Sequence, residues 1–94
     1  MQQHNGFWIS GTAVPGLPYT DYWSPSGAVL FQRANGSLVE LVRFALDSCE
    51  LDEEGVAALF GLELARLVVD TCYAELVCER RHFEQPPVKL LHRR

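Results

Sequence analysis

Residues 28–46 read AVLFQRANGSLVELVRFAL and decide the fold, because they contain the clearest pair of strand signals in the chain. Ala28 to Arg33 and Leu38 to Leu46 are rich in apolar and β-branched residues, and they flank Ala34-Asn35-Gly36-Ser37. Asn-Gly favours the positive φ angles that tight hairpin turns require. The stretch therefore predicts two antiparallel strands joined by a short turn.

The second of these strands has apolar residues on both of its faces. Alternation along a strand would put Val42 and Phe44 on one face, and Val39 and Leu41 on the other. A sheet with one face in water should alternate more cleanly than this. Either another element covers the second face, or the strand lies in the centre of the sheet.

Upstream, Phe7 to Val14 predicts a further strand, which Pro15-Gly16 ends. The proline-flanked stretch PYTDYWSP follows and places Tyr19, Tyr22 and Trp23 on a loop. These aromatic side chains favour a lid over the open end of a small sheet, with Trp23 opening the next strand. Tyrosine and tryptophan are also enriched at binding hot spots, so the loop is at the same time a candidate interaction surface.

Downstream, the pattern changes from strand to helix after Asp47. Asp52-Glu53-Glu54 places carboxylates where a first helical turn favours them, and Asp52 or Ser48 is the expected N-cap. Apolar spacings of three and four then continue from Val56 to Arg81, which predicts helix over this range.

One glycine interrupts this helical pattern. Gly61 predicts a break between a short helix ending near Phe60 and a long helix from about Leu62 to Arg80. The long helix has an apolar stripe that should pack on the sheet, consisting of Ala65, Val68, Val69, Cys72, Tyr73 and Leu76. A second, narrower apolar strip has no evident use in a monomer with one sheet, and it consists of Leu64, Leu67, Ala74 and Cys78.

Together these elements predict an α+β domain of the order β-β-β-α. We expect a three-stranded antiparallel sheet, packed on one face by a long C-terminal helix with a short extra helix before it. The domain spans residues 1–83, and a basic tail spans residues 84–94. The expected buried residues come from all three strands and the helix: Trp8, Ile9, Val29, Phe31, Val42, Phe44, Val69, Cys72, Tyr73 and Leu76.

Length and composition restrict the class of protein. A chain of 94 residues suffices for one domain with one core, and an apolar content of 48% excludes a disordered chain. No apolar run is long enough for a transmembrane helix, and Met1 to Asn5 lacks the features of a signal peptide. We therefore expect a cytoplasmic protein without membrane contact, whose three cysteines stay reduced.

The charges are divided unevenly along the chain. Residues 1–79 carry three basic and eleven acidic groups, whereas residues 80–94 carry five basic groups and one acidic group. An acidic body repels a phosphate backbone, so nucleic acid could bind only through the tail. The residues that would supply this contact are Arg80, Arg81, Lys89, Arg93 and Arg94.

No motif in the sequence points to catalysis or metal binding. Ser10 and Thr12 and the three histidines lie outside any G-x-S-x-G or H-E-x-x-H pattern. Cys78 and His82 are four residues apart, and Cys72 or Cys49 could join them, but no C-x2-C pair is present. The cysteines are therefore expected to act as small apolar residues, and we predict no catalytic residue, metal or cofactor.

Four segments give the chain a resemblance to known domains: NGFWI, YWSPSGAVL, NGSLVELVRF and LDEEGVAALFGLELARLVVD. Over about residues 5–72 the chain resembles a loose group of small bacterial β-β-β-α domains of unassigned function. These share a G-[FY]-x-I strand, a tryptophan-led second strand and an A-R-x-x-[VI]-D helix, which match Gly6–Ile9, Trp23–Val29 and Ala65–Asp70. The resemblance implies the fold and no activity, and the longer aromatic loop and the basic tail depart from it.

Three functions are compatible with these features. The first is a non-catalytic protein-interaction module that forms a homodimer or binds another protein. Its candidate surfaces are the second apolar strip, the second apolar face of the Leu38–Leu46 strand and the aromatic loop. The second is a nucleic-acid accessory protein that binds through the basic tail. The third is a small-molecule binder or enzyme with a pocket under the aromatic loop.

Overall fold

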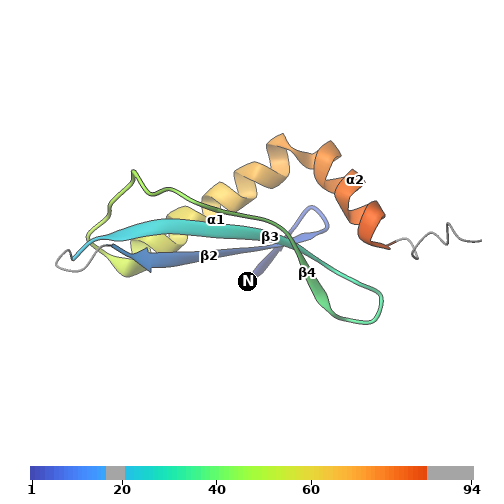
Figure 1. The fold of residues 1–94 in the computed structure, drawn as a ribbon, viewed down its shortest axis with the longest axis horizontal. Coiled ribbons are helices and arrows are strands. Elements are labelled where there is room, and N and C mark those ends of the chain that lie inside the picture. The colour runs from blue at the N-terminus through green and yellow to red at the C-terminus, as the bar shows by residue number, and fades with distance from the viewer. Residues whose placement is uncertain (17–20, 85–94) are drawn as a thin grey trace, which may run out of the picture.

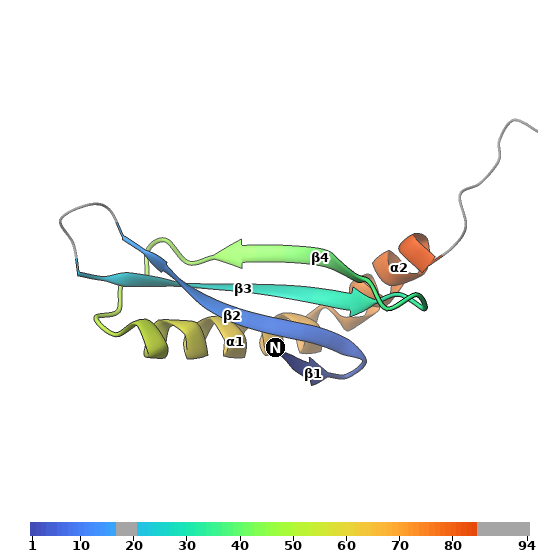
Figure 2. The ribbon, with the colours of Figure 1, turned by 90° about the horizontal axis from the view of Figure 1, so that it is seen from below.

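The computed structural model describes residues 1–16 and 21–84. These residues form an antiparallel four-stranded sheet and two helices, in the order β1 (Gln2–His4), β2 (Phe7–Pro15), β3 (Trp23–Gln32), β4 (Leu38–Ala45), α1 (Glu54–Thr71) and α2 (Tyr73–Glu84). The strands lie side by side in chain order, and α1 lies across one face of the sheet (Figures 1 and 2). The predicted α+β class and antiparallel sheet are confirmed. The sheet contains the three predicted strands and a fourth, β1, and the helical region divides into α1 and α2 at Cys72 and not near Gly61.

The hairpin of β3 and β4 forms where the sequence predicts it. Its loop is closed by two backbone hydrogen bonds, from Arg33 N to Ser37 O at 2.8 Å and from Gly36 N to Arg33 O at 2.9 Å. Only Gly36 adopts a positive φ, of 92°, while the Asn35 side chain accepts a hydrogen bond from the backbone N of Ser37. The loop is therefore longer than a two-residue Asn-Gly turn.

The two-residue Asn-Gly turn occurs instead at the N-terminus. Asn5 and Gly6 both have positive φ, 50° and 86°, as a type I′ turn requires. The turn joins β2 to the short strand β1, in which His4 pairs with Phe7. The sequence prediction missed β1, although its Asn-Gly pair is the strongest short-range hairpin signal.

An extra residue in β4 explains why this strand has apolar residues in both alternating sets. Val42 pairs with Val29, but Glu40 pairs with Leu30, so that the pairing passes over Leu41. This β-bulge shifts the alternation and brings Val39, Val42 and Phe44 to the face covered by α1. Neither expected explanation holds, because β4 is an edge strand and no described helix lies on its other face (Figure 1).

The face of the sheet away from α1, which we call the open face, receives both Glu40 and Arg43, because the bulge lies between these two residues. On β4, Arg43 Nη2 donates a hydrogen bond of 2.7 Å to Glu40 Oε1. This hydrogen bond, together with the negative charge of Glu40, raises the pKa of the Arg43 guanidinium.

The helix break occurs at Cys72 and not at Gly61. Gly61 lies buried inside α1, whereas Cys72 leaves helical geometry with φ −116° and ψ 27° (Figure 1). The start of α1 also differs from the prediction, since the N-cap position is Glu53 and no side chain caps it. The predicted caps Asp52 and Ser48 lie outside the helix.

Glycines set the distance between α1 and the sheet. A Cβ added to Gly61 would lie 1.9 Å from Ser26 O, and one added to Gly11 would lie 2.2 Å from Ala58 O. A Cβ on Gly27 would lie 2.6 Å from Gly61 O. The backbones of β2, β3 and α1 therefore approach so closely that even an alanine methyl group would not fit.

The core lies between α1 and the covered face of the sheet, and it extends along α2. Its fully or nearly buried members are Phe7, Ile9, Val29, Phe31, Ala65, Val69 and Leu76. Five of the expected core residues are confirmed, while Val42, Phe44 and Cys72 are half-buried. Two expectations were wrong: Trp8 lies on the open face because Phe7 and Ile9 face α1, and Tyr73 is 45% exposed.

Candidate functional site

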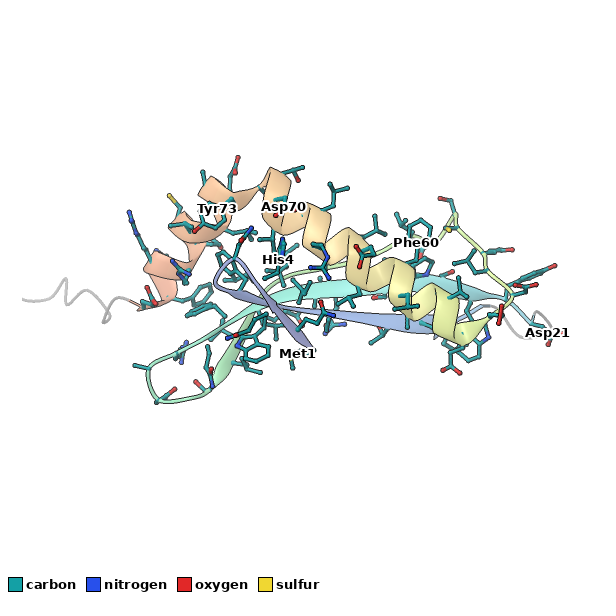
Figure 3. All side chains as sticks on the ribbon, turned by 180° about the vertical axis from the view of Figure 1, so that it is seen from behind. Met1, His4, Asp21, Phe60, Asp70 and Tyr73 are labelled. Atoms are coloured by element: carbon teal, nitrogen blue, oxygen red, sulfur yellow. The ribbon has the colours of Figure 1, made fainter. Side chains whose placement is uncertain are left out.

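The most unusual surface of the protein is the side of α1 that points away from the sheet. It carries Val56, Leu59, Phe60 and Leu67, whose side chains are 45%, 62%, 41% and 54% exposed, together with the carboxylate of Glu63. We call these five residues the outer face of α1. Their spacings of three, four and seven place them on one side of the helix. Figure 3 shows α1 with its side chains and labels Phe60.

The opposite side of α1, which we call its inner face, explains this exposure. Ala57, Gly61, Ala65 and Val69 recur at every fourth position and are the residues of α1 that are buried. Because the helix lies against the strand backbones at Gly61, only small side chains fit between the two layers near that point. The large apolar residues of α1 must therefore project to the flanks or into solvent.

The outer face is hollowed at its N-terminal half. Val56, Leu59, Phe60 and Glu63 line a shallow depression whose walls are almost entirely apolar. Aliphatic and aromatic side chains around one carboxylate provide contact area. They do not provide a nucleophile with an adjacent general base, which catalysis would require. The depression is suited to receive apolar side chains of a partner.

The chain leading into α1 is acidic and unpaired. Asp47, Glu50, Asp52, Glu53 and Glu54 are all exposed, and within residues 1–16 and 21–84 none of them forms a salt bridge. The first basic residue after Arg43 is Arg66, whose Nε donates to Glu63 Oε1 at 3.2 Å. The start of α1 therefore carries a concentrated negative charge next to the apolar depression.

A polar cluster lies on the flank of α1, where β1 and its turn meet the helix (Figure 3). His4 Nε2 and Asp70 Oδ1 are 2.7 Å apart, and Asn5 Nδ2 donates to the same oxygen at 3.1 Å. Arg66 Nη1 lies 3.3 Å from His4 Nδ1, and its Nη2 donates to Gln2 Oε1 at 2.7 Å. These bonds attach the N-terminal hairpin to α1.

This cluster resembles a histidine–carboxylate pair of the catalytic type but lacks its third member. Both ring nitrogens of His4 are occupied, one by Asp70 and the other by Arg66. A hydrolytic triad would need a hydroxyl or thiol at the second nitrogen. With a guanidinium in that place, the geometry supports attachment of β1 and not nucleophilic catalysis.

The predicted apolar strip is split by the break at Cys72. Leu67 is exposed and Leu64 half-buried on α1, whereas Ala74 and Cys78 are exposed on α2. Figure 1 shows that α2 runs at an angle to α1, so a single helical wheel does not describe both pairs. The strip therefore does not form one continuous stripe.

The sequence prediction missed Val56, Leu59 and Phe60 as surface residues. A break at Gly61 would place them on a separate short helix, where they would share no face with Leu67. A signal for their exposure is present in the sequence, because small residues at 57, 61 and 65 indicate the side of closest packing. Large apolar residues on the other side of such a helix cannot reach the same core.

The aromatic loop is only partly within the described residues. Tyr19 lies outside them, and Tyr22 is 46% exposed. Trp23 is half-buried and opens β3, and its backbone exchanges two hydrogen bonds with Leu51, of 2.7 and 2.9 Å. Trp23 thus opens the strand as the sequence predicts, and its backbone also holds the segment that leads into α1.

The basic residues that were nominated for nucleic-acid binding have different surroundings. The Arg80 guanidinium carbon lies 5.0 Å from the centroid of the Phe7 ring, and its buried Nε has no hydrogen-bond partner among residues 1–16 and 21–84. Arg81 is exposed on α2. Lys89, Arg93 and Arg94 lie outside the described residues. Arg80 therefore packs its guanidinium over Phe7 at the edge of the core.

The candidate metal ligands do not gather in the described part of the chain. Cys49 and Cys72 are half-buried and Cys78 is exposed, all as free thiols. Within residues 1–16 and 21–84, no three His, Cys, Asp or Glu side chains come together as a metal site requires. No helix in these same ranges is long and apolar enough to cross a membrane.

Comparison with known proteins adds no assignment: no protein-family model, curated protein or solved structure matches this chain.

Proposed function

We propose that this chain is a non-catalytic protein-interaction module that self-associates, with the outer face of α1 as its docking surface. One observation carries the proposal: α1 buries its small residues and exposes Leu59, Phe60 and Leu67 by 41–62%. Contiguous exposed apolar patches of this kind commonly mark interaction sites. The residues themselves are aliphatic and aromatic, which are the types that form the centre of interfaces.

The free energy gained by burying the outer face can be estimated from its exposed side chains. Burying a fully exposed leucine or phenylalanine side chain contributes about 1.5–3 kcal/mol, so the remaining half of each side chain is worth about 1 kcal/mol. Four such side chains on each of two copies give a favourable term of about 8 kcal/mol before the entropic cost of association. Because association costs about 4–15 kcal/mol of lost translational and rotational freedom, these side chains alone support a weak dimer that forms only at high concentration.

The polar cluster supports a non-catalytic role. Its histidine is held between Asp70 and Arg66, so that neither nitrogen is free to activate a substrate. Its contacts join β1 to the flank of α1, next to the outer face. These contacts favour a structural role, in which they fix the rotation of α1 about its own axis.

The solution mass tests the proposal. We expect the full chain to move from monomer toward dimer over a concentration series in multi-angle light scattering with reductant present. Leu59→Glu should leave the circular dichroism spectrum unchanged and shift the protein to monomer, because a carboxylate cannot enter an apolar interface without a partner.

Leu38→Glu is the matched control. Leu38 is also a partly exposed leucine, 42% exposed, but it lies at the start of β4 on the open face of the sheet. We expect this variant to associate like the unmodified chain. A dimer that survives Leu59→Glu, or a chain that stays monomeric at every concentration, would refute the proposed docking surface.

A further inference from the structure

We propose that the occupant of the outer face of α1 is the segment 85–94 of a second copy of the chain, exchanged reciprocally between two copies. This inference rests on the proposed self-association and names the part of the partner that docks. The segment reads QPPVKLLHRR and follows directly on α2, which ends at Glu84. It combines apolar Val88, Leu90 and Leu91 with three basic residues and no Asp or Glu.

The charges of the two surfaces are complementary. The approach to α1 carries five exposed carboxylates, of Asp47, Glu50, Asp52, Glu53 and Glu54, which have no salt-bridge partner within residues 1–16 and 21–84. The segment supplies Lys89, Arg93 and Arg94. Complementary potentials of this kind steer association and fix the orientation of the bound segment.

The lengths also agree when the segment runs antiparallel to α1. From Leu67 back to Glu53, just before α1 begins, a helix-like rise gives about 21 Å. From Val88 to Arg94 an extended chain covers about 20 Å. This alignment places Val88 near Leu67, the two leucines of the segment on the apolar depression, and the arginines beside the acidic start of the helix.

A chain cannot easily place this segment on its own α1 in that alignment. Four residues from Glu84 to Val88 span at most about 14 Å. The twelve residues of α2 measure about 18 Å and lead away from the end of α1 (Figures 1 and 2). Val88 therefore falls short of Leu67 within one copy, and the donor must be a second copy.

Reciprocal exchange closes the assembly. Each copy has one segment to donate and one outer face to receive, so two copies related by a two-fold axis satisfy both at once. The second contact then forms within an already joined pair, which raises the overall affinity above that of either contact alone.

Two full-length variants and their mixture test the exchange. Leu59→Glu damages the receiving face, and the double change Leu90→Glu with Leu91→Glu damages the donated segment. We expect each variant alone to show a dimer dissociation constant raised by at least about tenfold. Mixed in equal amounts they should form a heterodimer, detected by native mass spectrometry. The Leu59→Glu chain keeps an intact segment, and the segment variant keeps an intact outer face to receive it.

Salt dependence and a competing peptide give independent readouts. A synthetic peptide of residues 85–94 in excess should dissociate the unmodified dimer, and a peptide of the same composition in scrambled order should not. Raising the salt concentration should weaken the dimer, because exposed charge pairs are screened.

The outcomes separate this inference from the proposed function. If the segment variant dimerises normally while Leu59→Glu is monomeric, the outer face is an interface but another part of the second copy covers it, and the exchange is refuted. Absence of a heterodimer in the mixture refutes it as well. If the segment variant keeps its dimer but loses salt-sensitive binding of a labelled RNA, the segment binds nucleic acid instead. A dimer that survives Leu59→Glu refutes the proposed function itself.

Discussion

The inner and outer faces of α1 reverse the usual arrangement of an amphipathic helix. The inner face, which meets the sheet, consists of Ala57, Gly61, Ala65 and Val69, whereas the outer face carries two leucines, a valine and a phenylalanine. Both faces are apolar in sequence, so hydrophobicity alone does not tell which one is buried. The comparison shows that the distance between α1 and the sheet, which glycines set, decides which apolar residues can enter the core.

The largest effect is expected at the point of closest approach. Gly61→Ala should lower the free energy of unfolding by about 3 kcal/mol or more, because the added methyl group collides with backbone and not with a movable side chain. Urea unfolding followed by circular dichroism measures this.

Gly55→Ala is the matched control for that change. A Cβ on Gly55, at the start of the same helix, meets no atom within 4 Å. Here alanine should raise the free energy of unfolding by up to about 1 kcal/mol through helix propensity. Equal stabilities of the two variants would show that the helix does not lie as close to the sheet as the inner face implies.

An intermediate effect is expected at the flank between the two faces. His4→Ala removes the bonds to Asp70 and Arg66 and should lower the free energy of unfolding by about 1 kcal/mol. Gln3→Ala, on the same strand but with an exposed side chain outside this cluster, should change it by less than about 0.5 kcal/mol. If both changes have the same effect in thermal unfolding, the cluster does not hold β1 on the helix.

The smallest effect on folding is expected on the outer face. Leu67→Glu should change the free energy of unfolding of the monomer by less than about 0.5 kcal/mol, since the side chain is 54% exposed. Urea unfolding at a concentration below the onset of association measures this. A loss comparable to that of Gly61→Ala would mean that Leu67 belongs to the core of the monomer, and it would remove the contrast between the two faces.

Much of the fold follows from local patterns in the sequence. The strands β2 and β4 and the β3–β4 hairpin are predicted from β-branched runs and turn residues. The start of β3 at Trp23 is also predicted, although Pro25 and Gly27 are poor strand formers and weaken the local signal in its first half. Gly27 is needed there because a larger side chain would collide with α1, which is a tertiary requirement that no local propensity contains.

In the helical region, too, tertiary packing overrides the local propensity of the sequence. Helix propensity disfavours Gly61 and tolerates Cys72, yet α1 continues through the glycine and ends at the cysteine. Close packing on β3 stabilises helix at Gly61, because only glycine can contact Ser26 there. A helix broken at Gly61 would have no outer face, because the residues of this face lie on both sides of that position.

The bulge at Leu41 has a consequence for how copies of this protein can meet. A regular edge strand offers unpaired backbone groups to which another strand can add, and open sheets are prone to such growth. Here the edge strand β4 is irregular at the bulge and carries the Glu40–Arg43 ion pair. This edge of the sheet is therefore a poor template for the addition of a strand from another copy, and contacts between copies are directed to the helical side of the molecule.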